Sequence, residues 1–261
     1  MERIDGQELL RRYARGQRDF LLLEICGASL RRAGLSRINL MGTDLVATNL
    51  SEADLSGADL SGADLTRANL SYANLSDADL THAILGEANL TGANLSGACL
   101  QGVILGGEEP KPPNFSGANL TRTNLCHSQL PNASFRGANL TGADLQDSNL
   151  TDTNFTEACL LGTFLKQVNL SRANLSRANL FGTYLAEANL TGADLAKANL
   201  ECVNMYEADL SNVNLEEARI ILAIMPDGRV EGDRRLEYDL PDFRRGQLRV
   251  TPVVEANSAS I

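Results

Sequence analysis

The sequence predicts a solenoid built from blocks of five residues, because one position in every five holds a large apolar side chain. From residue 20 to residue 220 this position occurs 41 times; it is Leu at 33 of them, with Phe, Ile, Met and Pro at the others. An α-helix has ~3.6 residues per turn, so a spacing of five would spiral around its surface. A strand alternates its faces, so an odd spacing would put successive Leu residues on opposite sides. A chain that turns inward once in every block buries the whole row.

The other four positions of the block favour the same architecture. The residue two before each Leu is usually Ala, as in Ala53 and Ala58, and the residue one before it is usually Asn or Asp. Leu and Ala together provide one large and one small side chain for the interior. Asn and Asp favour turns, since their short side chains bond to nearby backbone groups. Gly is frequent two residues after Leu, where a corner needs freedom of φ.

This A(N/D)LXX pattern resembles that of the pentapeptide repeat family over residues 20–220. The resemblance implies an all-β protein, a right-handed quadrilateral β-helix in which four blocks make one coil of twenty residues. A period of twenty is also visible in the sequence itself. Phe115, Phe135 and Phe155 are twenty residues apart and should stack on one side of the core.

Residues 1–19 are predicted to form an N-terminal helical cap. Asp5 and Glu8 fit a capping box, and Gly16 can end the helix. The first coil of a solenoid exposes its interior, so a lid is expected there. Residues 8–20 also resemble the N-terminus of cyanobacterial members of the family, among them the heterocyst-differentiation regulator.

The repeat continues over residues 20–220 with one break. Residues 106–113 are predicted to form a loop, because their three prolines cannot donate to a ladder, yet the phase of five survives the loop. After residue 220, residues 221–225 fit one last strand and residues 226–228 fit a turn. Residues 221–261 are therefore predicted to be a C-terminal strand and turn cap with a partly disordered tail, from about residue 244 onward.

The sequence contains no catalytic constellation, and we expect no enzyme activity, no cofactor and no metal site. His82 and His127 occupy outward positions without partners at metal-ligand spacing. The five cysteines include no CxxC pair, which favours a reducing compartment. No apolar run is long enough to span a membrane, and the first residues lack a secretory apolar core, so a cytoplasmic protein is expected.

The net charge of −10 argues against direct binding to a nucleic acid backbone. An acidic rod can instead imitate a nucleic acid, and the resemblance implies this alternative, because family members that protect DNA gyrase are acidic rods proposed to mimic duplex DNA. Asp54, Asp59 and Asp64 on three successive sides of one coil fit it, with Asp77 and Asp79 nearby. The other interpretation is that the charge keeps a long rod in solution.

Several outward positions carry bulky apolar side chains where the pattern expects polar ones. In the position before Leu these are Ile84, Ile104, Phe164 and Tyr184, which are all congruent modulo twenty. In the position after Leu they are Leu21, Met41, Val46, Leu161, Phe181, Tyr206 and Ile221, which should flank the same face. Because both halves of the chain follow this rule, the loop is not expected to rotate one half against the other.

An exposed apolar face of this kind predicts an interface. The predicted interaction face comprises Ile84, Ile104, Leu161, Phe164, Phe181, Tyr184 and Tyr206. Its partner is an unidentified protein or a second copy of the chain. In the alternative interpretation the chain's own C-terminal segment folds back over the face, for instance through Val230, Leu236, Tyr238, Leu240 and Phe243.

The sequence therefore predicts a non-enzymatic regulatory protein that presents a rigid β-helix surface to another protein. The alternative function is that of a DNA-mimicking protein that binds gyrase or another topoisomerase.

Overall fold

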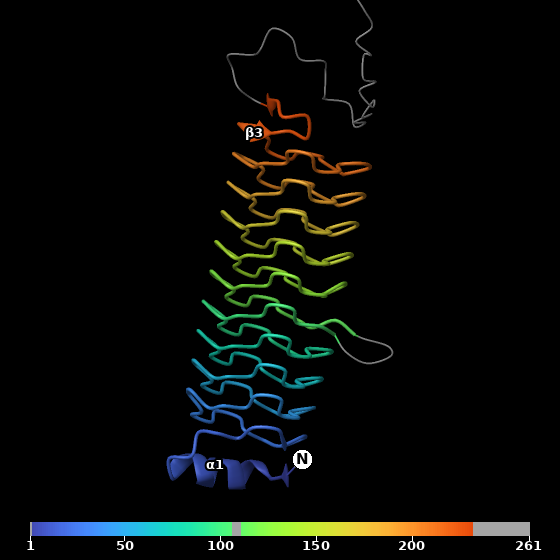
Figure 1. Ribbon diagram of the computed structural model, residues 1–261. Helices are drawn as coiled ribbons and strands as arrows, with labels where there is room; N and C mark the ends of the chain where they lie inside the picture. The colour runs from blue at the N-terminus through green and yellow to red at the C-terminus, as the bar shows by residue number, and fades with distance from the viewer. Residues whose placement is uncertain (1, 106–110, 232–261) are drawn as a thin grey trace, which may run out of the picture.

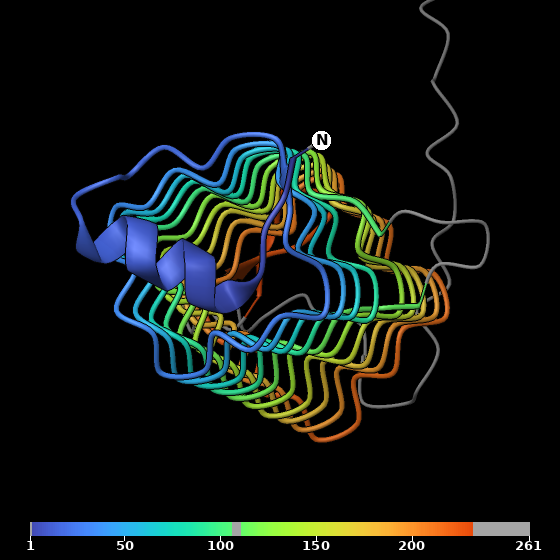
Figure 2. The same ribbon diagram turned by 90° about the horizontal axis from the view of Figure 1, so that it is seen from below.

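A computed structural model of the chain describes residues 2–105 and 111–231. Between its ends the chain winds into a rod of stacked coils (Figure 1), and a view along the rod shows that each coil has four sides (Figure 2). Parallel bridges join each coil to the next, as between Asp59 and Asp79. The prediction of an all-β, right-handed quadrilateral β-helix with a short N-terminal helix is confirmed.

The bridges are formed by the outward residue that precedes each large apolar one, and they define four walls, which we call A to D. Wall A runs through Asp19, Asn39, Asp59, Asp79, Cys99, Asn124, Asp144, Phe164, Tyr184, Asn204 and Ile224. Wall B runs through Glu24, Asp44, Asp64, Ile84, Ile104, Gln129, Asn149, Asn169, Asn189 and Asp209. Wall C begins at Ser29 and wall D at Gly34. The chain passes the walls in the order A, B, C, D, and each corner is named by the two walls that it joins.

Most corners of the described coils are hydrogen-bonded turns of one type. The backbone N–H of the small inward residue donates to the carbonyl of the preceding Leu, as from Ala53 to Leu50 at 3.1 Å. The third residue of the turn is left-handed, with a φ of 54° in Ala47 and 56° in Asp77. This is the type II arrangement, which favours Gly at its third residue. The frequency of Gly two residues after Leu follows from this conformation.

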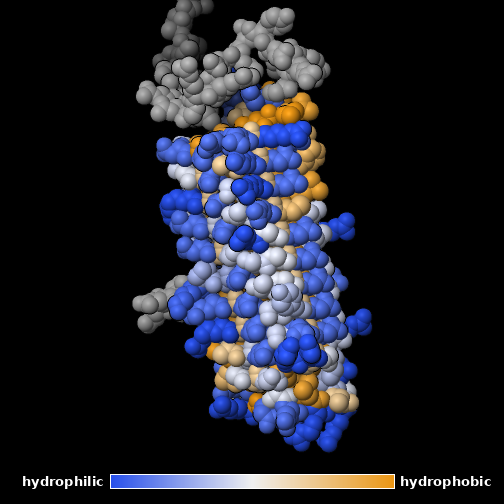
Figure 3. Space-filling model, turned by 180° about the vertical axis from the view of Figure 1, so that it is seen from behind, coloured by the Kyte–Doolittle hydropathy of each residue, from blue (hydrophilic) through white to orange (hydrophobic). Residues whose placement is uncertain are grey.

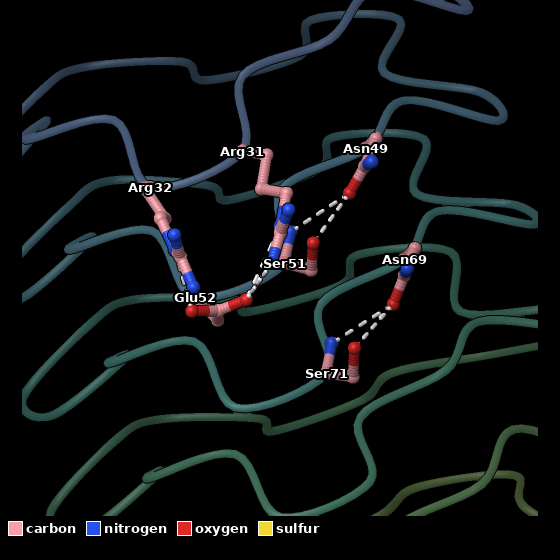
Figure 4. A network of polar contacts seen from close by, with 7 residues as sticks. All are labelled: Arg31, Arg32, Asn49, Ser51, Glu52, Asn69 and Ser71. Carbon is pink, nitrogen blue, oxygen red and sulfur yellow. Dashed lines mark hydrogen bonds and ion pairs between the residues drawn. The ribbon is translucent and has the colours of Figure 1, made fainter.

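The outward Asn and Asp side chains support the turn that follows them. Oδ1 of Asn49 accepts a hydrogen bond from the backbone N–H of Ser51 at 3.1 Å, and Asn69 does the same for Ser71 (Figure 4). This is an Asx turn, and its geometry serves Asn and Asp equally well. The preference for these two residue types before Leu is therefore a local requirement of the corner.

The interior of the rod is filled by the inward Leu and Ala residues, which are almost completely buried. The rings of Phe115 and Phe135 stack with their centroids 4.8 Å apart, and those of Phe135 and Phe155 with theirs 4.7 Å apart. The predicted aromatic stack is thus confirmed. Inward hydroxyl groups bond to the backbone, as from Oγ1 of Thr43 to the carbonyl of Phe20 at 2.9 Å. Within the described residues no buried side-chain nitrogen or oxygen lacks a hydrogen-bond partner.

The N-terminal end of the rod is closed by one helix and one strand. Strand β1 (Glu2–Arg3) pairs in parallel with β2 (Leu23–Glu24), and helix α1 (Gly6–Ala14) lies across the opening (Figure 2). Leu9 is fully buried and seals the first coil.

The predicted capping box of α1 is only half formed. Oδ1 of Asp5 accepts from the N–H of Glu8 at 2.7 Å, as expected for an N-cap. The Glu8 carboxylate, however, binds Arg12 at 2.6 Å and Arg11 at 2.7 Å. Two guanidinium groups one turn further along the helix offer charged donors, which are stronger than the neutral N–H of the N-cap residue.

One coil of the rod contains an extra block. On wall C, Asn89 bridges to Asn114 rather than to the residue twenty further on, and the N–H of Glu87 donates to the carbonyl of Lys111 at 2.9 Å. The chain therefore has five extra residues, the extra block, between Ile104 on wall B and Asn114 on wall C. Residues 106–110 of this stretch lie outside the described part. The phase of five survives, as predicted. The phase of twenty does not, because every later residue lies one wall earlier than counting in twenties would place it.

The described chain ends in a hairpin on wall A. Strand β3 (Ala223–Ile224) pairs antiparallel with β4 (Val230–Glu231), and Ile224 bridges to Asn204 below it. The last strand is thus shorter than the five residues predicted, whereas the turn at residues 226–228 is present. The predicted disorder from about residue 244 lies outside the described residues. No helix in the described part of the chain has the length and apolar character needed to cross a membrane.

Candidate protein-interaction surface

Five of the seven predicted interface residues lie together in the C-terminal half of the rod. Phe164 and Tyr184 project from wall A, Leu161 and Phe181 lie on the D–A corner, and Tyr206 lies on the A–B corner. Their exposed fractions range from 38% to 49%, which is high for side chains of this kind. We call these five residues the apolar patch. In Figure 3, apolar side chains gather along one edge of the rod towards its C-terminal end.

The centre of the apolar patch is an aromatic stack on the outside of the rod. Phe164 bridges to Tyr184 on the next coil, and their rings are nearly parallel, with centroids 5.2 Å apart. The stack follows from the bridge, because the coil spacing of ~4.8 Å is close to the distance preferred by stacked rings. Since both backbones are held in the ladder, the two rings form a rigid surface.

Ion pairs border the apolar patch on two sides. On the D–A side, Arg219 binds Glu201 at 2.7 Å, and on the A–B side, Lys166 binds Glu187 at 3.1 Å. Each pair is neutral, so the rim is polar but carries little net charge. An apolar centre with a polar rim is the usual anatomy of a protein interface.

The C-terminal hairpin reaches only one edge of the apolar patch. A Cβ atom added at Gly228 would lie 3.5 Å from the ring of Tyr206. A hydrogen bond to Glu207 raises the pKa of the Tyr206 hydroxyl, which therefore remains a neutral donor. Ile221 and Leu222 extend the apolar surface along the D–A corner, with 37% and 49% of their surfaces exposed.

Ile84 and Ile104 do not belong to this face, and the prediction that they share it with Phe164 and Tyr184 is wrong. Both isoleucines lie on wall B, and the N–H of Gln129 donates to the carbonyl of Val103, which continues wall B above Ile104. The extra block at residues 106–110 explains the error. It also overturns the expectation that the loop leaves the phase of twenty unchanged. The break in the repeat at GGEEPKPP could have predicted this shift, if five of its residues had been counted as an extra block.

Val46, predicted to flank the same face, lies on the B–C corner and does not border wall A, for the same reason. The acidic and histidine side chains lie where the pattern placed them. Asp54, Asp59 and Asp64 lie on walls D, A and B, and each caps its own turn by accepting a backbone N–H. His82 and His127 occupy left-handed, exposed corner positions. The three Asp side chains therefore support turns, and the two His side chains occupy turn positions on the surface.

Two of the cysteine side chains are held in the protonated, unreactive form. All five are free, and burial, together with the neighbouring carboxylate of Asp144, raises the pKa of Cys126 to about 12. Burial raises the pKa of Cys26 as well. Thiolates, not thiols, act as nucleophiles and metal ligands. The described residues also contain no group of His, Cys, Asp or Glu that could hold a metal ion.

The fold and the surface together define a repeat β-helix made of five-residue blocks, with an apolar patch in the C-terminal half of the rod. Comparison with known families gives the same class. The family model of pentapeptide repeats matches residues 48–86, 68–107, 114–147, 148–185, 178–216 and 188–225. The chain belongs to the pentapeptide repeat family.

Two solved structures illustrate the likeness. HetL, a pentapeptide repeat protein involved in heterocyst differentiation regulation from the cyanobacterium Nostoc sp. strain PCC 7120, is 35% identical. The match covers 87% of this chain and 99% of HetL, with a TM-score of 0.62. QnrB1, a plasmid-mediated fluoroquinolone resistance protein, is 19% identical, and its match covers 79% of this chain and 82% of QnrB1 with a TM-score of 0.45. No curated protein sequence matches the chain closely enough to add a further relative.

Proposed function

We propose that the chain is a non-enzymatic regulatory protein that binds a partner protein through the apolar patch. The observation that carries this proposal is the stack of Phe164 on Tyr184 on wall A, where seven of the nine other positions hold Asn or Asp. Neither ring contributes to the interior or to a turn. Large aromatic side chains in rigid, exposed positions are typical anchors of protein interfaces.

The shape of the rod supports the same function. The backbone of each coil is bonded to both neighbouring coils, so the apolar patch loses little conformational freedom when a partner binds. The likeness to HetL, which spans almost the whole of that protein, supports a regulatory role rather than a catalytic one. Regulation of cell differentiation is the process that HetL's description suggests for this chain.

The test replaces the two central rings by the residue that wall A otherwise uses. The variant Phe164→Asn with Tyr184→Asn restores the Asn found at positions 124 and 204, so each new side chain can cap its own turn. The matched control is Asn174→Asp with Asp194→Asn, which changes the same kind of position on wall C, opposite the patch, and keeps both turn caps and the net charge. Both variants should keep the thermal midpoint of the native chain.

The partner is first isolated from the source cell with the native chain and then purified, and its affinity is measured by calorimetry. The patch variant should lose at least about tenfold in affinity, while the control should retain it. Equal affinity of the patch variant and the native chain would overturn the proposal. A dimer of the native chain that dissociates in the patch variant would identify a second copy as the partner. A marked loss of thermal stability in the patch variant would show instead that the chain's own C-terminal segment covers the patch.

The alternative, a DNA-mimicking protein that binds gyrase, is supported by the net charge of −10 and by the outward carboxylates of Asp54, Asp59 and Asp64 on three walls. It predicts that the purified chain alters supercoiling by purified gyrase. An unchanged supercoiling rate at a large excess of the chain would remove this alternative without affecting the first proposal.

A further inference from the structure

We propose that the A–B corner of the first coils is a second docking surface, and that its ligand is a basic, amphipathic segment of another protein. We call this surface the acidic corner. Its centre is apolar and consists of Leu21, Leu22 and Met41. Its flanks are the carboxylates of Asp59 and Asp79 on wall A and of Asp44 and Asp64 on wall B.

The apolar centre is not required by the fold. Leu21, Leu22 and Met41 are 39%, 56% and 41% exposed, in corner positions where Ser, Thr or Gly is common. Leu22 also adopts a left-handed φ of 53°, which a branched apolar side chain accepts reluctantly. Much of the surface of these three side chains is therefore free to contact a ligand.

Beyond the apolar centre, the A–B corner carries no side chain at Gly62. Gly42 and Gly62 follow one another along it, and a Cβ atom added at Gly62 would meet nothing within 4 Å. At Gly42 the added atom would lie 2.6 Å from Cδ2 of Leu22, so the Leu22 side chain lies directly against the glycine. The backbone of a bound segment can therefore approach the rod closely along this line.

The carboxylates on the flanks lie opposite one another, although the fold does not require a charge at these positions. Asp44 bridges to Asp64, and Asp59 bridges to Asp79, so like charges lie directly opposite each other, which is unfavourable in a ladder. Their turns do not require a charge. Oδ1 of Asp59 accepts from Ser61 at 2.9 Å, and the neutral Asn49 makes the equivalent bond at 3.1 Å on wall C.

No basic side chain of the described residues neutralises these four carboxylates by an ion pair. The opposite corner of the same coils differs in this respect, since Glu52 there binds both Arg31 and Arg32 (Figure 4). The negative charge of the acidic corner thus remains available to a ligand. It favours a ligand that carries positive charge.

A ligand that satisfies both features has a row of apolar side chains with Lys or Arg on either side. The apolar row would cover the centre, and the basic side chains would reach the carboxylates on both flanks. Nucleic acids and anionic membrane surfaces are repelled by the same charge. This surface differs from the apolar patch in position and charge, so the inference is independent of the proposed function.

The probe is a fluorescent amphipathic peptide made of Leu and Lys at helical spacing, and its affinity is measured by fluorescence anisotropy. One variant carries Asp→Asn at positions 44, 59, 64 and 79, which keeps the caps and removes the charge. A second variant combines Leu21→Ser, Leu22→Gly and Met41→Ser. The matched control carries Asp→Asn at positions 54, 144, 194 and 209, which removes the same number of charges from the same kind of position elsewhere.

We expect each corner variant to weaken binding at least about tenfold, and the control to change it less than about threefold. Circular dichroism of every variant should show the native spectrum. An equal loss in the control and in the four-residue corner variant would overturn the inference, because the attraction would then be non-specific. Retention of binding in the apolar variant, or no binding by the native chain, would overturn it as well.

Discussion

The side-chain amide of Asn119 donates to Oδ1 of Asn94 at 3.1 Å, although 25 residues separate the two along the chain. One coil earlier, Asn94 donates to Asn74 at 3.0 Å across the usual 20 residues. The ladder on wall D thus continues without a step through the coil that contains the extra block. The described residues on either side of the five extra ones thus keep the ladder in register.

Deletion of residues 106–110 should therefore leave the fold and the thermal midpoint unchanged. Lys111 already occupies the ladder position that residue 106 would take, so the shortened chain needs no rearrangement. Deletion of residues 141–145 is the control, because it removes a block that forms part of a wall. Melting curves followed by circular dichroism should separate the two, and a large destabilisation by the first deletion would contradict the assignment of the extra block.

Leu145→Ala should lower the free energy of unfolding by about 2–5 kcal/mol, because it opens a cavity in a completely buried position. Gln146→Ala, at the next position, should change it by less than about 0.5 kcal/mol, because that side chain points outward. Chemical denaturation measures both values. Similar values for the two variants would mean that the inward and outward assignments are wrong.

Gly62→Val should destabilise the rod by about 1–2 kcal/mol through backbone strain alone. Gly62 has a φ of +63° and no atom near its missing side chain, so the strain is not confounded by a clash. Gly34→Val is the matched control, because Gly34 is equally open but lies outside the left-handed region. It should be neutral or stabilising in the same denaturation experiment; equal destabilisation of both variants would exclude the conformational explanation.

Stability should fall at alkaline pH, and Cys126 should contribute to the fall. Its pKa is about 12 in the folded chain, above the ordinary thiol value near ~8.5, so the folded state holds a proton that the unfolded state has released. The contribution is complete below the unfolded pKa and is lost progressively as the pH rises towards the folded one. Thermal midpoints measured between pH 8 and pH 11 should fall less steeply for Cys126→Ser than for the native chain.

The period of five was enough to predict a solenoid with a buried Leu row, because each position of the block has one structural role. The right-handed, four-sided form of the coil came from the resemblance to the pentapeptide repeat family. Leu must point inward, the Asn or Asp before it must cap the turn, and the second residue after it must be left-handed. The residue type alone therefore predicts that Leu50 is buried, that Asn49 caps a turn and that Gly62 has a positive φ. The N-cap at Asp5 was equally local. These predictions needed no knowledge of which coils touch.

The composition of a face could not be predicted in the same way, since it depends on the number of blocks in each coil. Ile104 and Phe164 are separated by a multiple of twenty, yet they lie on different walls. The opposed pairs of Asp44 with Asp64 and Asp59 with Asp79 precede the extra block, so the period of twenty already places them opposite each other. Residues 232–261 lie outside the described chain, so the alternative in which they cover the apolar patch stays a prediction.

The five extra residues between walls B and C have a consequence for how proteins of this architecture can change. If five residues were instead added within the walls, every side chain after them would advance by a quarter turn, while the Leu and Ala pattern of the interior stayed intact. Whether a five-residue insertion lies within the walls or outside them thus decides how one half of the surface is rotated about the rod axis relative to the other half. No substitution in the core is needed.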